Sequence, residues 1–248
     1  MTSVQHSPPV LHDVPQRSEA WFQLRCGRLT ASRAYDMLPR LRTTDTTARR
    51  DYLWQLVQEH LTQRVQERVV QTAPMRRGRT HEGAALEAYA RYTGYTVRRT
   101  GFVAHPTLLA GASLDGHIGT FDGLVEVKVP NTARHLWYRV SGRVPRQYRA
   151  QITHQLWLTG AQWCDFVSWD DRAWPASQQL SVVRVARNEA HIAWYDRQAR
   201  AFCGELAAAV DTVRFFTTAD LALAREVLTH CTRALASRGG ITLRRRAA

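Results

Sequence analysis

The run LVEVKVP alternates valine with charged residues, and an alternation with a period of two fits only one regular backbone, the β-strand. Successive side chains of a strand point to opposite faces, so Val125, Val127 and Val129 share one face. Glu126 and Lys128 share the other face. We expect the valine face to pack on the core and the charged face to open into a cleft or to solvent.

The residues before this strand predict its partner. The segment SLDGHIGTFDGLVEVK contains two strand-like stretches joined by a Gly/Asp turn, which is typical of a β-hairpin. If the turn centres between Thr120 and Phe121, Asp115 lies opposite Glu126, with the two side chains on one face and about 5 Å apart at Cβ. Facing carboxylates repel, so they need a proton or a cation between them. Mg²⁺ binds one or two carboxylates together with phosphate and water oxygens, which makes a divalent cation the simplest solution.

Lys128 is the only lysine in the chain, and the remaining basic residues are all arginine. A GC-rich genome would explain a general replacement of lysine by arginine, which makes the one retained lysine informative. Beside a metal, a lysine can lose a proton or orient a water, whereas an arginine stays charged and presents a wide planar fork. Taken alone, the VEVK segment is better explained as an ordinary exposed strand whose charge pair contributes little.

The charge balance narrows the class of partner. The 248-residue chain has 34 basic and 21 acidic residues and a net charge of +13, which favours a polyanion such as nucleic acid. It contains no apolar run long enough to span a membrane, and its polar start lacks the features of a signal peptide, so we expect a cytoplasmic protein. The cysteines are far apart and form no CxxC pair, so we expect reduced thiols rather than a zinc or iron–sulfur site.

The order of the expected elements indicates an α/β fold with a central mixed β-sheet flanked by helices. We expect a flexible arm over residues 1–17, a single domain over 18–237 and a loose basic tail over 238–248. Ser18 is the expected N-cap of a helix that ends at Gly27. Further helices are expected from about residue 32 and over 46–67, 77–94, 132–142, 145–160, 189–214 and about 218–237. Strands are expected over 95–105, 109–118, 123–130, 162–170 and 180–187.

Four blocks of the sequence together resemble a known family. SLDG followed by GLVEVKVP, over residues 113–130, resembles the PD-(D/E)xK nuclease signature. The blocks W…LRCGRLTAS (21–32), RGRTHEGAALEAY (77–89) and YRAQITHQLWLTG (148–160) lie around it in the order found in lambda-exonuclease-like, YqaJ-type phage recombination nucleases. Each block alone is weak, but four in order are specific, and with their flanks they cover about residues 18–187. The resemblance implies a restriction-endonuclease-like core.

The resemblance also implies a metal-dependent hydrolytic site. Asp115 and Glu126 would hold Mg²⁺, helped by the backbone carbonyl of Val127. The family pattern implies two ions about 4 Å apart, which would stabilise both the attacking and the leaving oxygen. Mn²⁺ is the expected substitute. Lys128 would position or activate the attacking water.

Two helices contribute further site residues in this family. Glu82 matches a helical glutamate that completes the site, with Glu87 as the weaker alternative. Gln151 matches a helical glutamine near the scissile phosphate. Related nucleases often have a tyrosine four residues later, where this chain has Gln155. The resemblance therefore assigns no role to Gln155, and an ordinary surface residue is the alternative interpretation of Glu82.

Substrate contacts are also implied by the resemblance. Arg25 matches the arginine that recognises a terminal 5′-phosphate, a role that suits bidentate guanidinium geometry. Ser32 is expected as a second contact, because a helix N-terminus adds backbone donors. Tyr148 shares a helix face with Gln151 and is expected to contact substrate. Each has a structural alternative: an arginine that caps a helix end, a serine N-cap and a tyrosine at the edge of the core.

Aromatic and basic side chains would supply the remaining contacts with DNA. The candidate wedges that separate the strands at a duplex end are Trp21, Phe22, Trp137 and Tyr138, although most aromatic side chains belong to a core. Three basic runs are expected to bind backbone phosphates without reading sequence: Arg76, Arg77 and Arg79; Arg98 and Arg99; and Arg143, Arg146 and Arg149. A solvated charged face is the alternative for each run.

Together these features predict an Mg²⁺-dependent 5′→3′ exonuclease that acts on duplex DNA ends with a 5′-phosphate and leaves 3′ single-stranded overhangs for phage-type recombination. By resemblance we also expect a ring-shaped homotrimer and a single-strand annealing protein as partner. One alternative is a restriction- or repair-type endonuclease with the same site. Another is a catalytically silent module that binds DNA ends, although the intact set of Asp115, Glu126 and Lys128 argues against it.

Overall fold

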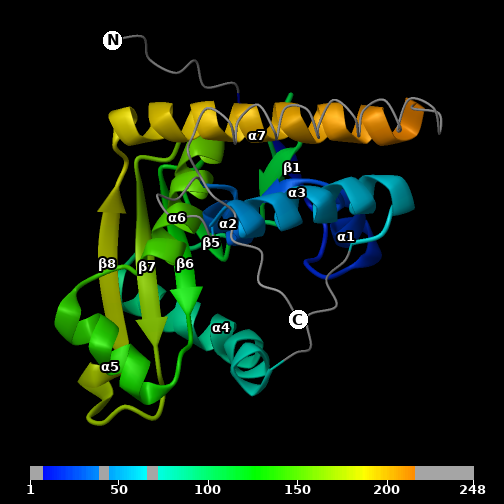
Figure 1. The fold of residues 1–248 in the computed structure, drawn as a ribbon. Coiled ribbons are helices and arrows are strands. Elements are labelled where there is room, and N and C mark those ends of the chain that lie inside the picture. Colours follow the sequence, from blue (N-terminus) through cyan, green and yellow to red (C-terminus); the bar gives the residue numbers. More distant parts are fainter. Residues whose placement is uncertain (1–7, 39–44, 66–71, 216–248) are drawn as a thin grey trace, which may run out of the picture. The chain divides into compact units, whose positions relative to one another are not determined.

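The computed structural model describes residues 8–38, 45–65 and 72–215, and Figure 1 shows the arrangement of the elements. The chain divides into two compact units, residues 1–206 and residues 207–248. All the described strands lie in the first unit, as do all the described helices except the last turns of α7 (Glu189–Phe215).

The domain limits expected from sequence need one correction. Residues 1–7 lie outside the described part of the chain, but β1 (Val10–His12) pairs antiparallel with β3 (Phe102–Ala104). The expectation of a flexible arm is therefore wrong for these three residues, whose run is too short to signal a strand. The division between the two units falls inside the expected domain over 18–237. The expected final helix and basic tail, about 218–237 and 238–248, lie outside the described residues.

The described strands form two mixed four-stranded sheets, where one central mixed sheet is the expectation from sequence. The first sheet has the order β1-β3-β4-β2, with β2 (Leu29–Thr30) parallel to β4 (Ala110–Ala112). The second has the order β5-β6-β7-β8, and only β6 and β7 run parallel in it. Its strands are β5 (Gly116–Ile118), β6 (Gly123–Lys128), β7 (Trp163–Trp169) and β8 (Leu180–Ala186). Residues 113–115 carry the chain from the first sheet to the second, which places Asp115 at their junction.

The helices begin and end at residues whose chemistry favours these positions. Ser18 is the N-cap of α1, as expected, because its hydroxyl accepts a hydrogen bond from the Trp21 amide. Thr72 caps α4 in the same way, and α4 ends at Gly94, whose φ of 75° is a conformation that glycine adopts without strain. The described helices are α1 (Glu19–Arg25), α2 (Ala34–Met37), α3 (Asp45–Thr62), α4 (Ala73–Thr93), α5 (Thr132–Ser141), α6 (Arg146–Thr159) and α7, with short 3₁₀ turns at Ala31–Arg33 and Ala176–Gln178.

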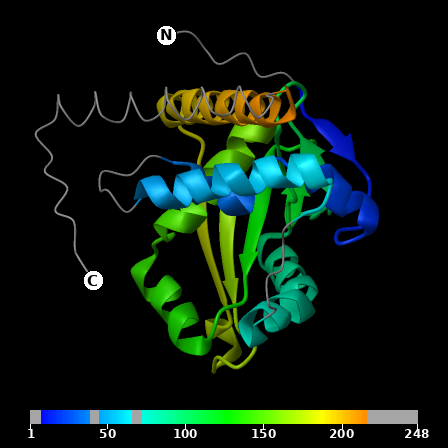
Figure 2. The same ribbon diagram turned by 45° about the vertical axis from the view of Figure 1, so that its right-hand side comes forward.

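The two faces of β6 pack against different elements. Val125, Val127 and Val129 are buried in a cluster with Ala85, Leu86 and Tyr89 of α4, which confirms the expected core face. On the other face, α6 supplies side chains that contact Glu126. Figure 2 shows α4 (teal) on one side of the second sheet and α5 (green) on the other. The central strand is therefore covered on both faces, and its last three residues, Glu126, Val127 and Lys128, line a cleft.

Two expectations about the environment of the chain can be compared with the structure. Within the described ranges, no helix combines the length and apolar character needed to cross a membrane. Cys26, Cys164 and Cys203 are free thiols, and Cys231 lies outside the described residues.

Candidate active site

The hairpin of β5 and β6 has the register that the sequence predicts. Gly116 pairs with Val125, so Asp115, which directly precedes β5, lies opposite Glu126. The Asp115 carboxylate accepts a hydrogen bond through Oδ2 from the backbone N–H of Val127 at 2.7 Å. Asp115 thus satisfies an amide of β6 beyond the point where β5 pairs, and this contact fixes the carboxylate at the strand.

Glu126 is almost completely buried, with 1% of its surface exposed. Of the two environments expected for the charged face of β6, a cleft or solvent, the structure shows the cleft, and α6 covers Glu126 beside it. Gln151 Nε2 donates to Glu126 Oε1 at 2.7 Å, and Gln155 Nε2 donates to Oε2 at 2.7 Å. The Lys128 ammonium also donates to Oε1. A buried carboxylate needs such partners, since burial without them is costly.

Lys128 contacts the buried carboxylate of Glu126 and also lines the open cleft. Its Nζ lies 4.8 Å from the centre of the Tyr148 ring, so the ammonium contacts an aromatic face as well as Glu126. Burial lowers the pKa of Lys128, but the negative charges of Glu126 and Asp115 outweigh this effect, and the pKa is raised. The ammonium is therefore the favoured form beside the two carboxylates. An arginine would place a wide planar fork there instead of one compact donor group.

The electrostatics of Asp115 differ from those of a surface carboxylate. Burial raises its pKa well above the ordinary value, and the nearby charges of Glu126 and Glu82 raise it further. Lys128 and the Val127 amide act in the opposite direction but do not cancel this shift. Burial and the neighbouring carboxylates thus disfavour the ionised form of Asp115, and a bound cation would favour that form.

One cleft of about 380 Å³ brings the expected catalytic residues together. The hairpin, α4 and α6 each form part of its wall. The residues predicted from sequence that line it are Glu82, Asp115, Glu126, Val127, Lys128, Tyr148 and Gln151. Arg79, expected as a member of a basic run, lines it too. The others are Pro74, Met75, Gly78, Val129, Pro130 and Arg134. Three of the four sequence blocks therefore meet at this one cleft.

Glu82, not Glu87, is the glutamate of α4 at this cleft. Glu82 lines the cleft and accepts a hydrogen bond from Arg99 Nη2 at 3.2 Å. Glu87 is exposed and makes only a loose ion pair with Arg91 at 3.9 Å. Arg99 thus contacts a site carboxylate, which the expectation of a plain phosphate-binding run did not include.

The donor set at Asp115 and Glu126 fits a hard divalent cation. Among the described residues, Asp115 Oδ1 accepts no hydrogen bond and Glu126 Oε2 accepts only one. The N–H and C=O of one strand residue point to the same side, so the carbonyl of Val127 faces the side of Asp115. The described ranges hold no group of three or more His, Cys, Asp or Glu residues placed to bind a metal. A cation here would therefore depend on two carboxylates, one carbonyl and oxygens from substrate and water.

Arg25 lies in a separate, basic hollow. This hollow is lined by Arg25, Arg28, Arg33, Thr30, Tyr52, Gln55, Leu56, Glu59 and Val65, none of which lines the cleft. Ser32 is exposed and does not line it, and Thr30 occupies the wall instead. Ser32 is also not an N-cap, because it lies inside the 3₁₀ turn Ala31–Arg33. The structure therefore brings Arg25 together with two further arginines but not with Ser32.

A short path of contacts connects this hollow with the hairpin. The Arg25 guanidinium lies 4.3 Å from the centre of the Trp21 ring. Trp21 Nε1 donates to Ser113 Oγ at 2.8 Å, and Ser113 is two residues before Asp115. Trp21 therefore has a structural role between the two regions. It is buried, so it is wrong as a candidate wedge.

The other candidate wedges differ in exposure. Tyr138 is buried in the core and is also excluded as a wedge. Phe22 is partly buried and makes an edge contact with Trp21, with ring centres 5.0 Å apart. Trp137 of α5 is 52% exposed and stays a candidate wedge.

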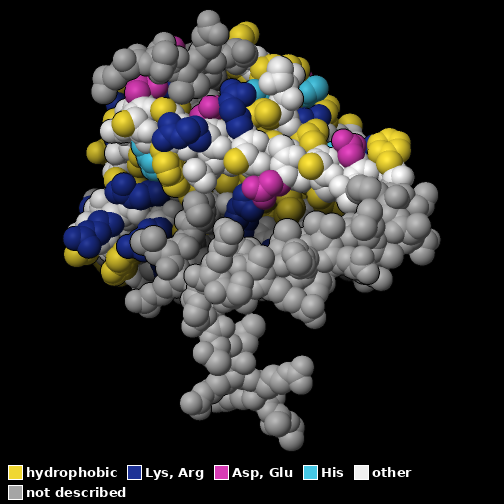
Figure 3. All heavy atoms as spheres, turned by 45° about the horizontal axis from the view of Figure 1, so that its top comes forward, with side chains coloured by type: hydrophobic (Ala, Val, Ile, Leu, Met, Phe, Trp, Pro, Cys, Tyr) yellow, Lys and Arg dark blue, Asp and Glu magenta, His cyan; other side chains and the backbone are white. Residues whose placement is uncertain are grey.

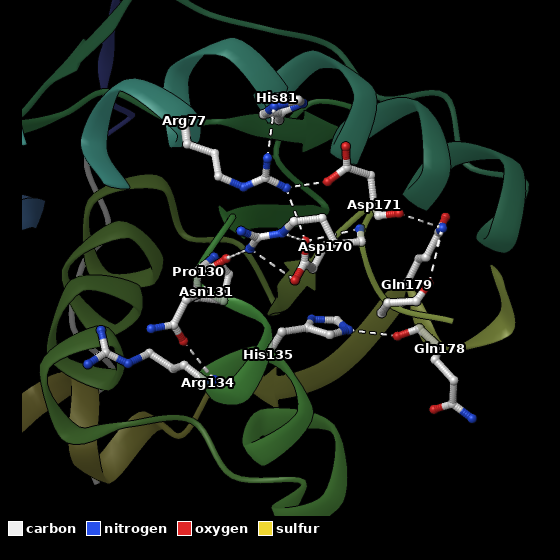
Figure 4. A network of polar contacts seen from close by, with 12 residues as sticks. Arg77, His81, Pro130, Asn131, Arg134, His135, Asp170, Asp171, Gln178 and Gln179 are labelled. Carbon is white, nitrogen blue, oxygen red and sulfur yellow. Dashed lines mark hydrogen bonds and ion pairs between the residues drawn. The ribbon is translucent and has the colours of Figure 1, made fainter. Parts of the chain in front are cut away.

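Most members of the three basic runs are at the surface, but Arg77 and Arg79 are partly buried. Arg76, Arg98, Arg99, Arg143, Arg146 and Arg149 are exposed. Figure 3 shows several basic side chains (dark blue) on the face in view, mostly toward its left. Arg77 instead binds the buried carboxylate of Asp170 at 3.0 Å and also contacts Asp171. Figure 4 shows these groups converging next to Pro130. Arg77 is thus a structural residue, which corrects its assignment to DNA phosphates.

Sequence reasoning missed two features of these regions. Gln155 binds Glu126, and its spacing of four residues from Gln151 is the signal that places both amides on one helix face. Arg28 and Arg33 lie beside Arg25 in the basic hollow. The spacing of these arginines crosses a strand and a 3₁₀ turn, so no single periodicity indicates their convergence.

Mixed sheets flanked by helices, with an Asp, a Glu and a Lys of one hairpin in a cleft, match the nuclease class that the sequence predicts, a hydrolase that acts on DNA. Comparisons with known proteins agree with this class. Residues 20–162 match the model of the YqaJ-like viral recombinase domain. The chain therefore belongs to the YqaJ-like viral recombinase family, and it is a DNA exonuclease. No curated protein sequence matches the chain.

Solved structures support the same relationship. An alkaline exonuclease, LHK-Exo from Laribacter hongkongensis, is 36% identical over 79% of this chain and 96% of that chain, with a TM-score of 0.72. The structure of LHK-Exo in complex with dAMP matches with the same identity and coverage and a TM-score of 0.71. A phage related exonuclease from Haemophilus somnus 129PT shares the fold at 10% identity, covering 75% of this chain and 96% of that chain, with a TM-score of 0.60. The fold is the restriction-endonuclease-like fold.

Proposed function

We propose that the chain is an Mg²⁺-dependent exonuclease that degrades duplex DNA from its 5′ ends and leaves 3′ single-stranded overhangs. The observation that supports this most is the meeting of Asp115, Glu126 and Lys128 in one cleft, with free acceptor positions on both carboxylates. Family membership supports an exonuclease. The relative LHK-Exo was solved with dAMP, a nucleotide of the kind that DNA hydrolysis releases.

The cation would be held by Asp115, Glu126 and the carbonyl of Val127. Two ions, with Mn²⁺ as a substitute for Mg²⁺, would polarise the phosphoryl group and stabilise charge on the attacking and leaving oxygens. Neutralisation by a cation also relieves the repulsion that raises the pKa of Asp115. The carboxylate donors are hard oxygen ligands, which suit Mg²⁺.

The protein's own side chains position the reacting groups. The Lys128 ammonium orients the attacking water next to the phosphorus, while Gln151 and Tyr148 line the wall along which the strand lies. Water attacks phosphorus and the P–O3′ bond breaks. The released nucleotide keeps a 3′-hydroxyl, and the shortened strand carries a new 5′-phosphate. Glu82, held by Arg99, completes the acidic side of the cleft.

The basic hollow of Arg25, Arg28 and Arg33 is the proposed site for the terminal 5′-phosphate. Guanidinium groups bind phosphate oxygens in a bidentate manner, and three of them around one hollow would favour a doubly charged terminal phosphate over an internal diester. The contacts through Trp21 and Ser113 fix this hollow relative to Asp115. By family resemblance, we extend the proposal to a ring-shaped homotrimer and an annealing protein as partner.

Replacing Arg25 by alanine should lower the preference for 5′-phosphorylated over 5′-hydroxyl ends by about 10-fold, the effect of losing one charge-assisted contact of ~1.5 kcal/mol. Initial rates on two duplexes that differ only in this phosphate measure the ratio. Arg91→Ala is the matched control, because Arg91 is an exposed arginine of α4 that lines neither the basic hollow nor the cleft. An unchanged ratio in Arg25→Ala would remove Arg25 from end recognition.

A plasmid digest tests the exonuclease against the endonuclease alternative. With Mg²⁺, linear duplex should be converted to nucleotides and single strands, while closed circular duplex stays intact because it offers no end. Nicking or linearisation of the circle would support a restriction- or repair-type enzyme. Binding of linear duplex without release of nucleotides would support the silent module.

A further inference from the structure

We infer that Gln155 selects among divalent cations at the site by leaving Glu126 only one free acceptor position. Gln155 and Gln151 lie one turn apart on α6, so both amides reach Glu126 from the same helix face. Oε1 of Glu126 accepts from Lys128 and Gln151, and Oε2 accepts from Gln155. A carboxylate offers about four acceptor positions, two on each oxygen. Oε1 is therefore fully used, and Oε2 keeps one position.

The environment of Gln155 indicates that its amide serves Glu126 rather than the stability of the core. The residue is buried, a position where an apolar side chain is usual. An ionised carboxylate only accepts hydrogen bonds, so the NH₂ group of Gln155 must be the part that faces it. The amide Oε1 of Gln155 is buried and accepts no hydrogen bond from the described residues. An unsatisfied buried acceptor destabilises a fold, so the NH₂ contact with Glu126 is the useful half of this side chain.

One free position on Oε2 restricts how Glu126 can bind a cation. Ca²⁺ takes roughly six to eight oxygens and often binds both oxygens of a carboxylate, whereas Mg²⁺ prefers octahedral geometry with one oxygen from each. Asp115 is less restricted, because among the described residues only its Oδ2 accepts a hydrogen bond, from the Val127 amide. Because Oε1 is used by Lys128 and Gln151, Glu126 can offer a cation only Oε2, and Gln155 holds that oxygen to one position in a fixed direction. Mg²⁺ needs such a fixed geometry more than Ca²⁺ does. The site therefore favours Mg²⁺ over Ca²⁺. This inference rests on the proposed metal site.

Gln155→Met removes the donor and keeps a similar volume. Calorimetric titration of the full chain with Mg²⁺ and, separately, with Ca²⁺ gives the ratio of the two affinities without any nuclease assay. We expect the Mg²⁺ affinity to fall by about 10-fold or more, the effect typical of removing a group that orients a metal ligand. We expect the Ca²⁺ affinity to fall less, so that the preference for Mg²⁺ narrows. Gln155→Asn, too short to reach Glu126, should act in the same direction.

Trp157→Phe is the matched control. Trp157 is also buried on α6 and donates to a carboxylate, Asp196 Oδ1 at 2.9 Å, but it does not line the cleft. Its loss should lower thermal stability and leave the ratio of the two affinities unchanged. If either folded Gln155 variant keeps the wild-type ratio, the inference is overturned and the proposed function stands. If the wild-type chain binds neither cation, the proposed metal site is overturned together with the inference.

Discussion

Replacing Lys128 by alanine should lower kcat for DNA hydrolysis by about 10²–10⁴-fold, the range for losing a side chain that positions or moves a proton in the reaction. Lys128→Arg should be nearly as inactive, because a planar fork cannot replace a compact ammonium between Glu126 and the Tyr148 ring. DNA binding should persist in both variants, since many exposed arginines supply the affinity for phosphates. Single-turnover nucleotide release and fluorescence anisotropy measure the two properties.

Arg91→Ala is the control for the loss of one positive charge, because Arg91 is exposed and lies outside the cleft. It should keep the wild-type rate. Wild-type turnover in Lys128→Ala would remove Lys128 from the reaction. Full activity in Lys128→Arg would mean that only its charge matters, and loss of DNA binding in Lys128→Ala would point to a role in affinity.

Replacing Asp115 by asparagine should abolish nucleotide release and, at the same time, stabilise the cation-free protein. The asparagine lacks the negative charge that burial and the nearby carboxylates disfavour, and its carbonyl can still accept from the Val127 amide. The loss of a carboxylate removes an oxygen ligand of the cation, so hydrolysis should fall by at least the factor expected for Lys128→Ala. Thermal unfolding in EDTA should show a higher Tm for the variant at neutral pH.

The pH dependence of this stabilisation has a defined sign. Folding raises the pKa of Asp115 above 3.8, its ordinary value, so the folded chain binds the proton more tightly than the unfolded chain. At low pH the Asp115 carboxyl is protonated in both states and does not change the free energy of unfolding. As pH rises toward the folded pKa, the carboxyl destabilises the fold increasingly. The gain in Tm should therefore grow with pH from about 4 upward. Asp122→Asn, an exposed position of the same hairpin, should show no such growth, and equal pH profiles for both variants would contradict this account of Asp115.

Local sequence pattern predicted the hairpin register and the partners Asp115 and Glu126, because strand alternation and turn position are encoded within about fifteen residues. The Ser18 cap and the core face of β6 follow from equally local signals. The burial of Glu126 does not, since it depends on α6 packing over a strand far from it in sequence. The sequence pattern of a strand with one charged face is the same whether solvent or a helix covers that face.

Contacts between distant segments account for the other differences. Arg77 looks like one member of a basic run, but its partners Asp170 and Asp171 lie more than ninety residues away. Trp21 looks like a candidate wedge, yet its indole is buried and donates a hydrogen bond to Ser113. Charge and aromaticity predict what a side chain can bind, whereas the fold decides which partner is within reach.

The most direct test of the central claim is the order in which labels leave a 5′-phosphorylated linear duplex labelled at either the 5′ or the 3′ end of one strand. We expect the 5′ label to be released first, as a mononucleotide, in Mg²⁺, and no release in EDTA. The Asp115→Asn variant should release neither label. Earlier release of the 3′ label, or release that continues in EDTA, would contradict a metal-dependent 5′→3′ exonuclease built on Asp115, Glu126 and Lys128.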